Sequence, residues 1–456
     1  MAAVLQVQSQ SRGVMLGTGD KVAVVGLGKT GLSALRFLHR AGIECLAVDT
    51  RDAPPGLEEA KSLAGVPVFT GGLRSDMLAW ATHLLVSPGI GLDQPDVRAA
   101  LERGAGLISD IDLFAQAVTA PVIAVTGSNG KSTVTTLVTE MATQAGIKAK
   151  AGGNLGTPVL DMVAEDCGLY VVELSSFQLE RTRKLRPQVG AILNISPDHL
   201  DRYESLADYA AVKGRLFELS KICVANGDDS RVQNLAKKSG CHQVLNFGVE
   251  SGFVDFGLQV YEGETWLTFH EQKLIPGSEV ALQGRHNLAN ALAALALGEA
   301  AGIPMPARLK ALRQFQGLPH RMQKVAESGG VVWINDSKGT NVGATVAAIT
   351  GLPGPVILLA GGEGKGADFT PLSPVAKNKV KIAILFGHDK GKLQETLADA
   401  TETILVEDLD EAVTIARQKA TPGDTVLLSP ACASQDQFNN YEDRGNRFIE
   451  LVRSFA

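Results

Sequence analysis

The chain has 456 residues, a formal net charge of −6 at pH 7 and 45% hydrophobic residues. This length suits about three domains, each large enough to bury its own core. The acidic balance gives no field that would attract nucleic acid or an anionic membrane, so any phosphate binding must come from local sites. No stretch approaches the ~20 consecutive apolar residues that a membrane span requires.

The cysteines and the start of the chain favour a cytoplasmic location. The five cysteines are scattered, odd in number and without a C-x-x-C pair, which favours reduced thiols over a disulfide framework or a zinc site. Residues 1–13 lack the basic and apolar regions of a signal peptide, and Met15 is an alternative functional start. We therefore expect a protein of the reducing cytoplasm.

Short runs of Val, Ile and Leu alternate with Ala-rich amphipathic stretches along the whole chain. This alternation is typical of parallel sheets flanked by helices, because parallel strands are buried on both faces. The sequence therefore predicts an α/β fold throughout. No internal repeat of solenoid period and no low-complexity segment interrupts the pattern.

The first segment reads as a strand, a helix and a second strand, at Lys21–Val25, Ala34–Arg40 and Glu44–Val48. The turn Gly26–Gly31 has the pattern G-x-G-x-x-G, and Asp49 follows the second strand. This is the Rossmann fingerprint, which predicts a nicotinamide dinucleotide. Alternatively, the glycines allow close packing of strand and helix, and Asp49 caps the strand end.

A later strand of this segment ends in small residues, Ser87-Pro88-Gly89. Open α/β sheets bind ligands at the carboxyl ends of their strands. We expect this loop and the glycine turn before it to line one crevice.

The second segment begins with a phosphate cradle. The apolar strand Val122–Thr126 runs into Gly127-Ser128-Asn129-Gly130-Lys131-Ser132-Thr133, where a helix starts. Glycines let backbone N–H groups face an anion, a helix N-terminus favours it, and a lysine adds a full charge. Val125 stands where the strict P-loop pattern has glycine, so the loop is a shortened relative. The alternative is a plain glycine turn with an exposed lysine.

Two strand ends in this segment carry candidate ligands. Glu173 ends the apolar run Leu169–Leu174, where an unpaired carboxylate would be costly to bury. Magnesium beside a nucleotide is one natural partner, and a salt bridge is the other. His199 lies between two aspartates after a strand predicted at Val189–Ile195, and its pattern suits a structural histidine as well as a ligand.

Two helices of this segment leave their polar residues ambiguous. Lys213 lies in the amphipathic stretch Tyr209–Phe217, which by itself suggests a solvated surface lysine. Asn287 and Asn290 are three residues apart at the start of a long Ala/Leu helix. They could cap that helix or read the edge of a base.

A glycine and a proline interrupt the pattern at residues 316–321, where we place a domain boundary. Three later strands each end in a polar loop, at residues 335–341, 361–368 and 430–434. Three such loops in succession indicate a ligand crevice at one edge of a third sheet.

Five motifs taken together resemble the Mur ligase family, ATP-dependent amide-forming enzymes of peptidoglycan precursor synthesis. They are Gly127–Thr133, Glu173 in ELSSFQL, Asn194–Asp201, His286–Ala294 and Pro319-His320-Arg321, in family order over essentially the whole chain. Within the family, Asn335–Asn341, Gly361–Phe369 and Leu428–Phe438 resemble the D-glutamate-adding branch, and the Asp-Asn-Pro-Arg motif of diaminopimelate-adding relatives is missing.

The resemblance implies three domains. Residues 1–109 would form a Rossmann-like domain that binds the UDP part of the substrate, instead of a nicotinamide cofactor. Residues 110–317 would form a central P-loop-type ATPase domain with a parallel sheet, and residues 318–456 a Rossmann-like domain that binds D-glutamate. Since three substrates must converge away from water, we expect the third domain to close on the second about a hinge near Leu318 and Pro319.

The resemblance also implies roles for individual residues. Catalytic roles fall to Lys131, Glu173, His199, Lys213 and Arg321. ATP would contact Gly127, Ser128, Asn129, Gly130, Lys131, Ser132, Thr133, Asn287, Arg321 and Asp336. The UDP-substrate would contact Gly28, Thr30, Asp49, Thr50, Arg51, Ser87, Asn154 and His199. D-glutamate would contact Thr340, Lys365, Ser429 and Phe438.

Magnesium is the cofactor that the resemblance implies, with Ser132, Glu173, His199 and, as a carbamate, Lys213 as its ligands. The substrates would be ATP, D-glutamate and UDP-N-acetylmuramoyl-L-alanine, and the enzyme a monomer. Other amino-acid-adding or folylpolyglutamate-type ligases are the nearest alternatives. A dehydrogenase would bind NAD at the first segment without using Lys131, and a nucleotide-binding regulator would bind ATP without turnover.

Overall fold

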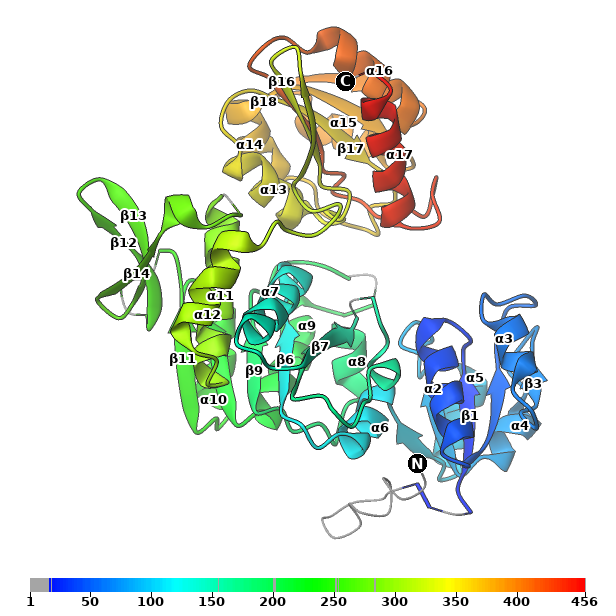
Figure 1. Ribbon diagram of the computed structural model, residues 1–456. Helices are drawn as coiled ribbons and strands as arrows, with labels where there is room; N and C mark the ends of the chain where they lie inside the picture. Colours follow the sequence, from blue (N-terminus) through cyan, green and yellow to red (C-terminus); the bar gives the residue numbers. More distant parts are fainter. Residues whose placement is uncertain are drawn as a thin grey trace.

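The computed structural model describes residues 16–17, 19–154, 156–199, 202–250, 252, 254–282 and 284–455. Three α/β bodies follow one another along the chain, each built on one sheet (Figure 1). This confirms the predicted fold class. The expected domain boundaries at 109/110 and 317/318 fall between the sheets and remain predictions. The alternative start at Met15 lies outside the described residues.

The first sheet is fully parallel, with the strand order β3-β2-β1-β4-β5. Its strands are β1 (Lys21–Val25), β2 (Glu44–Val48), β3 (Val68–Phe69), β4 (His83–Val86) and β5 (Gly106–Ile108). Its helices are α2 (Lys29–Arg40), α3 (Leu57–Ser62), α4 (Ser75–Trp80) and α5 (Pro95–Glu102). Helix α6 (Asp110–Ala117) follows β5 and packs on the 3-10 turn at Val159–Asp161 of the central body. The glycine turn after β1 and the loop after β4 lie side by side, as the sequence predicts, because β1 and β4 are neighbours.

The central sheet has nine strands in the order β14-β13-β12-β11-β10-β9-β6-β8-β7. The strands are β6 (Val122–Thr126), β7 (Ala149–Gly153), β8 (Leu169–Glu173), β9 (Val189–Ile192), β10 (Ile222–Asn226), β11 (Gln243–Phe247), β12 (Phe256–Tyr261), β13 (Glu264–Phe269) and β14 (Gln272–Pro276). The helices are α7 (Lys131–Gln144), α8 (Ser176–Arg181), α9 (Leu206–Leu219), α10 (Ser230–Lys238), α11 (Arg285–Ala300) and α12 (Met305–Gln314), with 3-10 turns η1 (Val159–Asp161) and η2 (Gly277–Glu279).

Two expectations for this sheet are corrected. The sheet is not parallel throughout, because β12, β13 and β14 form an antiparallel meander at one end. The strand expected at Val189–Ile195 ends at Ile192. Asn194 leaves the strand path because its side chain accepts from the Asn129 backbone N–H at 2.8 Å.

The third sheet has six strands in the order β15-β16-β20-β17-β18-β19. Its strands are β15 (Gln323–Ser328), β16 (Val331–Asn335), β17 (Val356–Gly361), β18 (Val380–Phe386), β19 (Glu402–Leu405) and β20 (Thr425–Leu428), and its helices are α13 (Val342–Gly351), α14 (Leu372–Lys379), α15 (Lys390–Leu397), α16 (Leu409–Lys419) and α17 (Tyr441–Arg453). The strands β16, β20 and β17 are parallel neighbours, so their three polar loops leave the same sheet edge.

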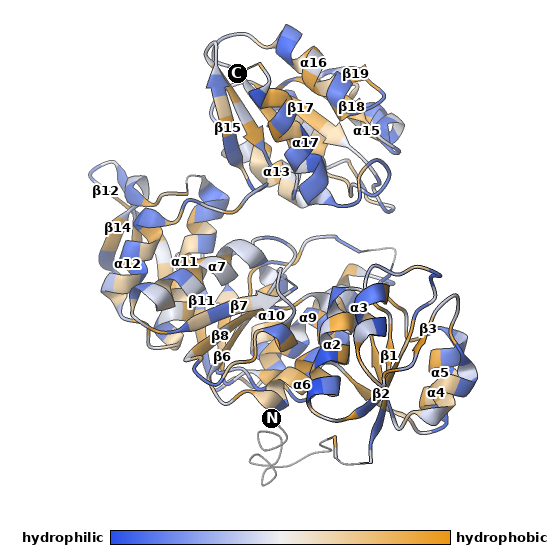
Figure 2. Ribbon diagram, turned by 45° about the vertical axis from the view of Figure 1, so that its right-hand side comes forward, coloured by the Kyte–Doolittle hydropathy of each residue, from blue (hydrophilic) through white to orange (hydrophobic). Residues whose placement is uncertain are grey.

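The cores follow the hydropathy of the strands. Apolar residues gather on the central strands of each sheet, and polar residues gather on the outer helix faces (Figure 2). No described helix combines the length and the apolar character needed to cross a membrane.

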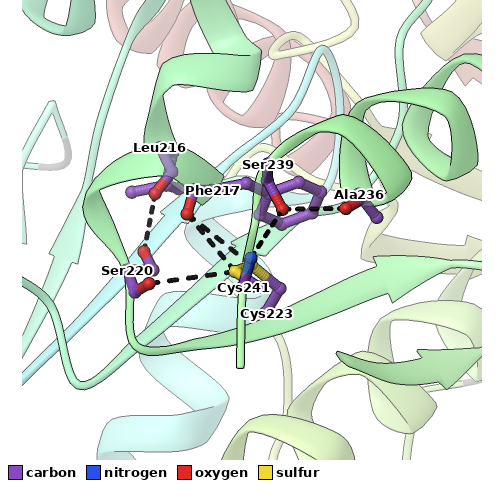
Figure 3. The surroundings of a disulfide bond; sticks show 7 residues. All are labelled: Leu216, Phe217, Ser220, Cys223, Ala236, Ser239 and Cys241. Atoms are coloured by element: carbon purple, nitrogen blue, oxygen red, sulfur yellow. Dashed lines mark hydrogen bonds between the residues drawn. A yellow bond between two sulfur atoms is a disulfide. The ribbon is translucent and has the colours of Figure 1, made fainter. Parts of the chain in front are cut away.

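The expectation of reduced cysteines is wrong for one pair. Cys223 of β10 and Cys241, two residues before β11, form a disulfide with their Cα atoms 6.2 Å apart (Figure 3). The helix α10 crosses between two parallel strands and returns the chain to the same sheet end, which brings the two sulfurs together. An 18-residue separation carries no motif. Cys45, Cys167 and Cys432 are free thiols.

Candidate active site

The predicted phosphate cradle has the expected strand, loop and helix. Gly127 and Gly130 have φ angles of 152° and 84°, which a side chain would strain. A Cβ on Gly130 would also lie 2.4 Å from the Asn290 side-chain oxygen, so the Asn290 side chain packs closely on the loop. The Lys131 Nζ donates to the Gly127 and Ser128 carbonyl oxygens, each at 2.8 Å, and closes over the loop. Its location allows it to reach an anion held by the loop.

A chain of hydrogen bonds joins Asn154, Glu173 and Ser132 of the central domain to Arg321. The Ser132 hydroxyl donates to Glu173 Oε2 at 2.6 Å, and the Asn154 amide donates to Glu173 Oε1 at 2.7 Å. Arg321 Nη2 donates to the same Ser132 hydroxyl oxygen at 2.6 Å. The buried Glu173 carboxylate is thus hydrogen-bonded by neutral groups, and the salt-bridge alternative is not what the described residues show.

Lys213 is buried, so its interpretation as a solvated surface lysine is wrong. Its side chain is 1% exposed, and its Nζ donates to the Gly127 carbonyl oxygen at 3.0 Å. Burial, and then the nearby Lys131 charge, hold the pKa of Lys213 well below its usual value. The Lys213 Nζ lies 4.5 Å from the Tyr209 ring centroid, and the His199 ring centroid lies 6.5 Å from the same ring. The structure therefore places His199 and Lys213 around one tyrosine beside the cradle.

Magnesium is the one cofactor that the sequence implies, and two residues fit it. Ser132 and Glu173 present buried hard oxygen donors beside the phosphate loop, and Mg²⁺ is commonly held by one or two carboxylates together with nucleotide phosphates and water. Among the described residues, no three His, Cys, Asp or Glu side chains gather into a metal site. As a free amine, Lys213 is a hydrogen-bond donor and no ligand, so its predicted metal role requires the carbamate.

A cavity of about 630 Å³ lies between the first and second domains and reaches the third. It is lined by seven of the residues expected to contact the UDP-substrate, namely Gly28, Thr30, Asp49, Thr50, Arg51, Ser87 and Asn154. Ser132 and Glu173 lie at the same cavity, so a bound substrate would extend toward the phosphate cradle. His199 does not line this cavity.

Asp49 organises the glycine turn. The carboxylate accepts from the Leu27 backbone N–H at 2.6 Å and from the Arg51 side chain at 2.8 Å and 2.9 Å. Burial opposes ionisation, but the Arg51 and Leu27 hydrogen bonds outweigh it and lower the pKa of Asp49 to about 2. Asp49 therefore fixes the conformation of the glycine turn that lines the cavity.

A second cavity, of about 960 Å³, lies between the central and third domains. Its lining includes Asn129, Gly130, Thr133, Asn287, Arg321 and Asp336 from the expected ATP contacts. Gly284 is the N-cap residue of α11, so neither asparagine occupies that position. Asn290 instead packs against the phosphate loop at Gly130.

The four residues expected to contact D-glutamate are not gathered. Ser429 is fully buried, and its hydroxyl donates to Asp336 Oδ2 at 2.7 Å. Lys365 is exposed, with a φ of 52°, and Thr340 lines neither of the two cavities. Phe438 lines a separate cavity against α16 and α17, and its expected contact with D-glutamate remains a prediction. Burial of Asp336 raises the pKa of that carboxyl to about 7, despite the Ser429 hydrogen bond.

Two residues that sequence reasoning left unassigned do face the site. Lys338 lines both cavities, and Tyr441 lines the first with its ring centroid 3.8 Å from the Lys338 Nζ. Burial lowers the pKa of Lys338 to about 8. The signal for Lys338 was its place inside the motif Asn335–Asn341. Tyr441 carried no signal beyond its closeness to Phe438 in sequence.

The linker between the second and third domains is attached to the third domain from His320 onward. The His320 side chain is held in the third domain by the buried Asn335 amide at 3.0 Å, and the Met322 N–H donates to Asp336 at 3.2 Å. Arg321 therefore lies between two residues that are hydrogen-bonded to the third domain, while its guanidinium reaches Ser132 of the central domain. This agrees with a hinge near Leu318 and Pro319.

Domain closure is expected to appear in solution scattering. With an ATP analogue, magnesium and the UDP-substrate bound, the radius of gyration should fall, because the third domain rotates onto the central one. Small-angle X-ray scattering of the full chain with and without ligands measures this. Identical profiles at saturating ligand would rule out closure.

Comparisons with known proteins identify the family of this chain. The chain matches the Mur ligase MurD-like N-terminal domain at residues 20–109, the Mur ligase middle domain at 125–298 and the Mur ligase glutamate ligase domain at 320–432. It is 50% identical over 439 residues to the UDP-N-acetylmuramoylalanine--D-glutamate ligase of Methylococcus capsulatus, covering 96% of this chain and 95% of that protein. The enzyme of the same name from Escherichia coli is 45% identical over 444 residues, 96% of this chain and 99% of that protein.

Solved structures agree on the fold. UDP-N-acetylmuramate-alanine ligase from Thermotoga maritima superposes with a TM-score of 0.63 at 18% identity, covering 96% of this chain and 100% of that chain. A pseudomurein peptide ligase type C from Methanothermus fervidus gives 0.62 at 20% identity, covering 96% and 100%. With relatives this similar over nearly its whole length, the chain belongs to the Mur ligase family.

Proposed function

We propose that this chain is the ATP-dependent ligase that adds D-glutamate to UDP-N-acetylmuramoyl-L-alanine during peptidoglycan precursor synthesis. The observation that carries the proposal is the 630 Å³ cavity, whose lining comes from all three domains and includes Ser132 and Glu173 beside the phosphate cradle. The relatives that are 45–50% identical carry the name of this activity. A hydride-transfer enzyme would have no use for the cradle.

The chemical task is to make an amide from a carboxylate, whose negative charge repels nucleophiles. The alanine carboxylate of the UDP-substrate attacks the γ-phosphate of ATP, which gives an acyl phosphate and ADP. The D-glutamate amine then attacks the acyl carbon, and inorganic phosphate leaves as the amide forms. Lys131 and Arg321 neutralise charge on the transferring phosphoryl group, where a preorganised cation has its largest effect.

Magnesium belongs to this proposal with Ser132 and Glu173 as its protein ligands, and it would neutralise charge on the nucleotide phosphates. The carbamate on Lys213 and the metal role of His199 remain predictions. The buried, low-pKa amine of Lys213 supports the former, because a carbamate forms from the neutral amine.

D-glutamate is expected to bind where Lys338 and Tyr441 meet the central site, with Thr340 and Lys365 reaching it on closure. Lys338 supplies a cation for a substrate that carries two carboxylates. Ser429 would act through Asp336, and the contact of Phe438 with D-glutamate remains a prediction.

The cellular location and the oligomeric state proposed for this protein rest on its family alone. A monomer in the cytoplasm is what the precursor pathway implies. The Cys223–Cys241 disulfide removes the argument for a reducing compartment that the cysteine pattern had supplied.

The proposed function is tested by phosphate release from ATP with magnesium and UDP-N-acetylmuramoyl-L-alanine. We expect release with D-glutamate, and little release with L-glutamate, diaminopimelate or no amino acid. Release that depends on another amino acid would keep the family and change the acceptor. No release with any amino acid would contradict the proposal.

A further inference from the structure

An arginine of the central domain holds a loop of the first domain. Arg181, the last residue of α8, is 2% exposed. Its guanidinium donates to the carbonyl oxygens of Val86, Ser87 and Ile90, the Ser87 contact measuring 2.6 Å. Helix α8 lies on the side of the central domain that faces the first domain (Figure 1). One side chain therefore binds three backbone carbonyls, at the end of β4 and in the loop after it.

This loop is a wall of the cavity expected to bind the UDP-substrate. The Ser87 hydroxyl donates to the Gly26 carbonyl oxygen at 3.0 Å. A Cβ on Gly26 would lie 2.8 Å from Ile90 Cδ1, so the loop packs directly on the glycine turn. Ser87, Ile90 and Gly26 all line the cavity. A shift of the loop would therefore move this wall of the cavity.

The other end of α8 belongs to the same cavity. The helix begins three residues after Glu173, and Phe177 and Gln178 in its first turn line the cavity. The helix has six residues, a length of about 9 Å. This short helix therefore connects Glu173, which precedes it, with Arg181 at its end, which holds the loop.

The buried positive charge of Arg181 makes its hydrogen bonds to the loop costly to break. Burial, followed by the nearby Arg202 charge, lowers the pKa of Arg181 to about 10, so the guanidinium stays protonated at neutral pH. Within the described ranges no carboxylate makes an ion pair with it, and its Nε has no hydrogen-bond partner. Because a buried cation without partners is costly, moving the loop away from the guanidinium is opposed.

We propose that Arg181 is a positioning residue that fixes the Val86–Ile90 loop against the central domain and thereby sets the affinity for the UDP-substrate without acting on ATP. Arg202 adds a weaker attachment, since its Nη1 donates to the Pro88 carbonyl oxygen at 3.2 Å. The proposal rests on the function proposed above, because it assumes which substrate part the cavity binds.

The test compares binding of two ligands to full-length variants. In Arg181→Met, which keeps the apolar stem, the Kd for UDP-N-acetylmuramoyl-L-alanine should rise about 10- to 100-fold, the loss expected for charged hydrogen bonds. The Kd for an ATP analogue should change less than about twofold, since ATP lies at the other cavity. Arg181→Lys keeps the positive charge but loses the planar guanidinium that donates several hydrogen bonds at once, so its Kd should be intermediate. Arg186→Met, at an exposed position of the same segment, is the matched control.

Isothermal titration calorimetry gives both constants, and thermal melting reports folding. A wild-type chain that binds no UDP-substrate would refute the proposed function itself. If the wild type binds and Arg181→Met binds equally well, or if both Kd values rise together, the positioning role is refuted. Should Arg181→Met not fold, Arg202→Met must still weaken only the UDP-substrate, and an unchanged Kd there refutes the proposal.

Discussion

Replacing Lys131 by alanine is expected to lower kcat for D-glutamate-dependent phosphate release by about a thousandfold or more. The Lys131 Nζ already lies against the phosphate loop, where it donates to two loop carbonyl oxygens, each 2.8 Å away. Lys213 donates to the same Gly127 carbonyl oxygen at 3.0 Å, but its amine lies beside the Tyr209 ring. The loss should appear mainly in kcat, since the charge that Lys131 meets grows during phosphoryl transfer.

A steady-state phosphate assay on purified variants measures this effect. Lys148→Ala is the matched control, because Lys148 is 73% exposed and pairs only with the exposed Asp166. The control should keep wild-type rates. A Lys131→Ala enzyme that retained a tenth of the wild-type kcat would show that the loop binds its anion without this lysine.

Replacing Glu173 by glutamine is expected to lower kcat about a hundredfold and to raise the magnesium concentration needed for half-maximal activity. Glutamine keeps the size of the side chain and one oxygen to accept from Ser132 or Asn154, so the fold should survive. What it loses is the negative charge that a hard cation requires. The loss of activity should therefore depend on magnesium concentration. A loss caused by a structural defect would not.

A magnesium titration of the phosphate-release rate separates these cases. Glu165→Gln, on the exposed loop before β8, is the control for loss of one negative charge. An unchanged magnesium dependence in Glu173→Gln would assign Glu173 to hydrogen bonding alone. Thermal melting of both variants checks that the buried substitution has not unfolded the domain.

Local sequence patterns predicted much of the site correctly. The cradle from Gly127 to Thr133 needs only glycines at fixed offsets, a strand before it and a helix after it, all of which are local. The same holds for the glycine turn of the first domain. The three polar loops of the third domain were predicted to share a sheet edge, which the pairing of β16, β20 and β17 confirms.

Burial and pairing over long distances could not be predicted in this way. The pattern around Lys213 is amphipathic, and only the packing of α9 on the central sheet places its amine under the phosphate loop. The meander β12–β14 looked like any short apolar run, because periodicity does not say whether neighbouring strands run parallel or antiparallel. Phe438 and Tyr441 are three residues apart, and the start of α17 decides which one faces the cavity.

The sequence by itself determined the α/β class, the phosphate cradle and the family, because each depends on residue types at short, fixed spacings. Only the tertiary structure decided the contacts between distant segments: Arg321 on Ser132, Asn154 on Glu173, Arg181 on the Val86–Ile90 loop, and Cys223 with Cys241. These contacts depend on which strands become neighbours and how whole domains pack. That is set by the burial of three separate cores, which no local spacing encodes.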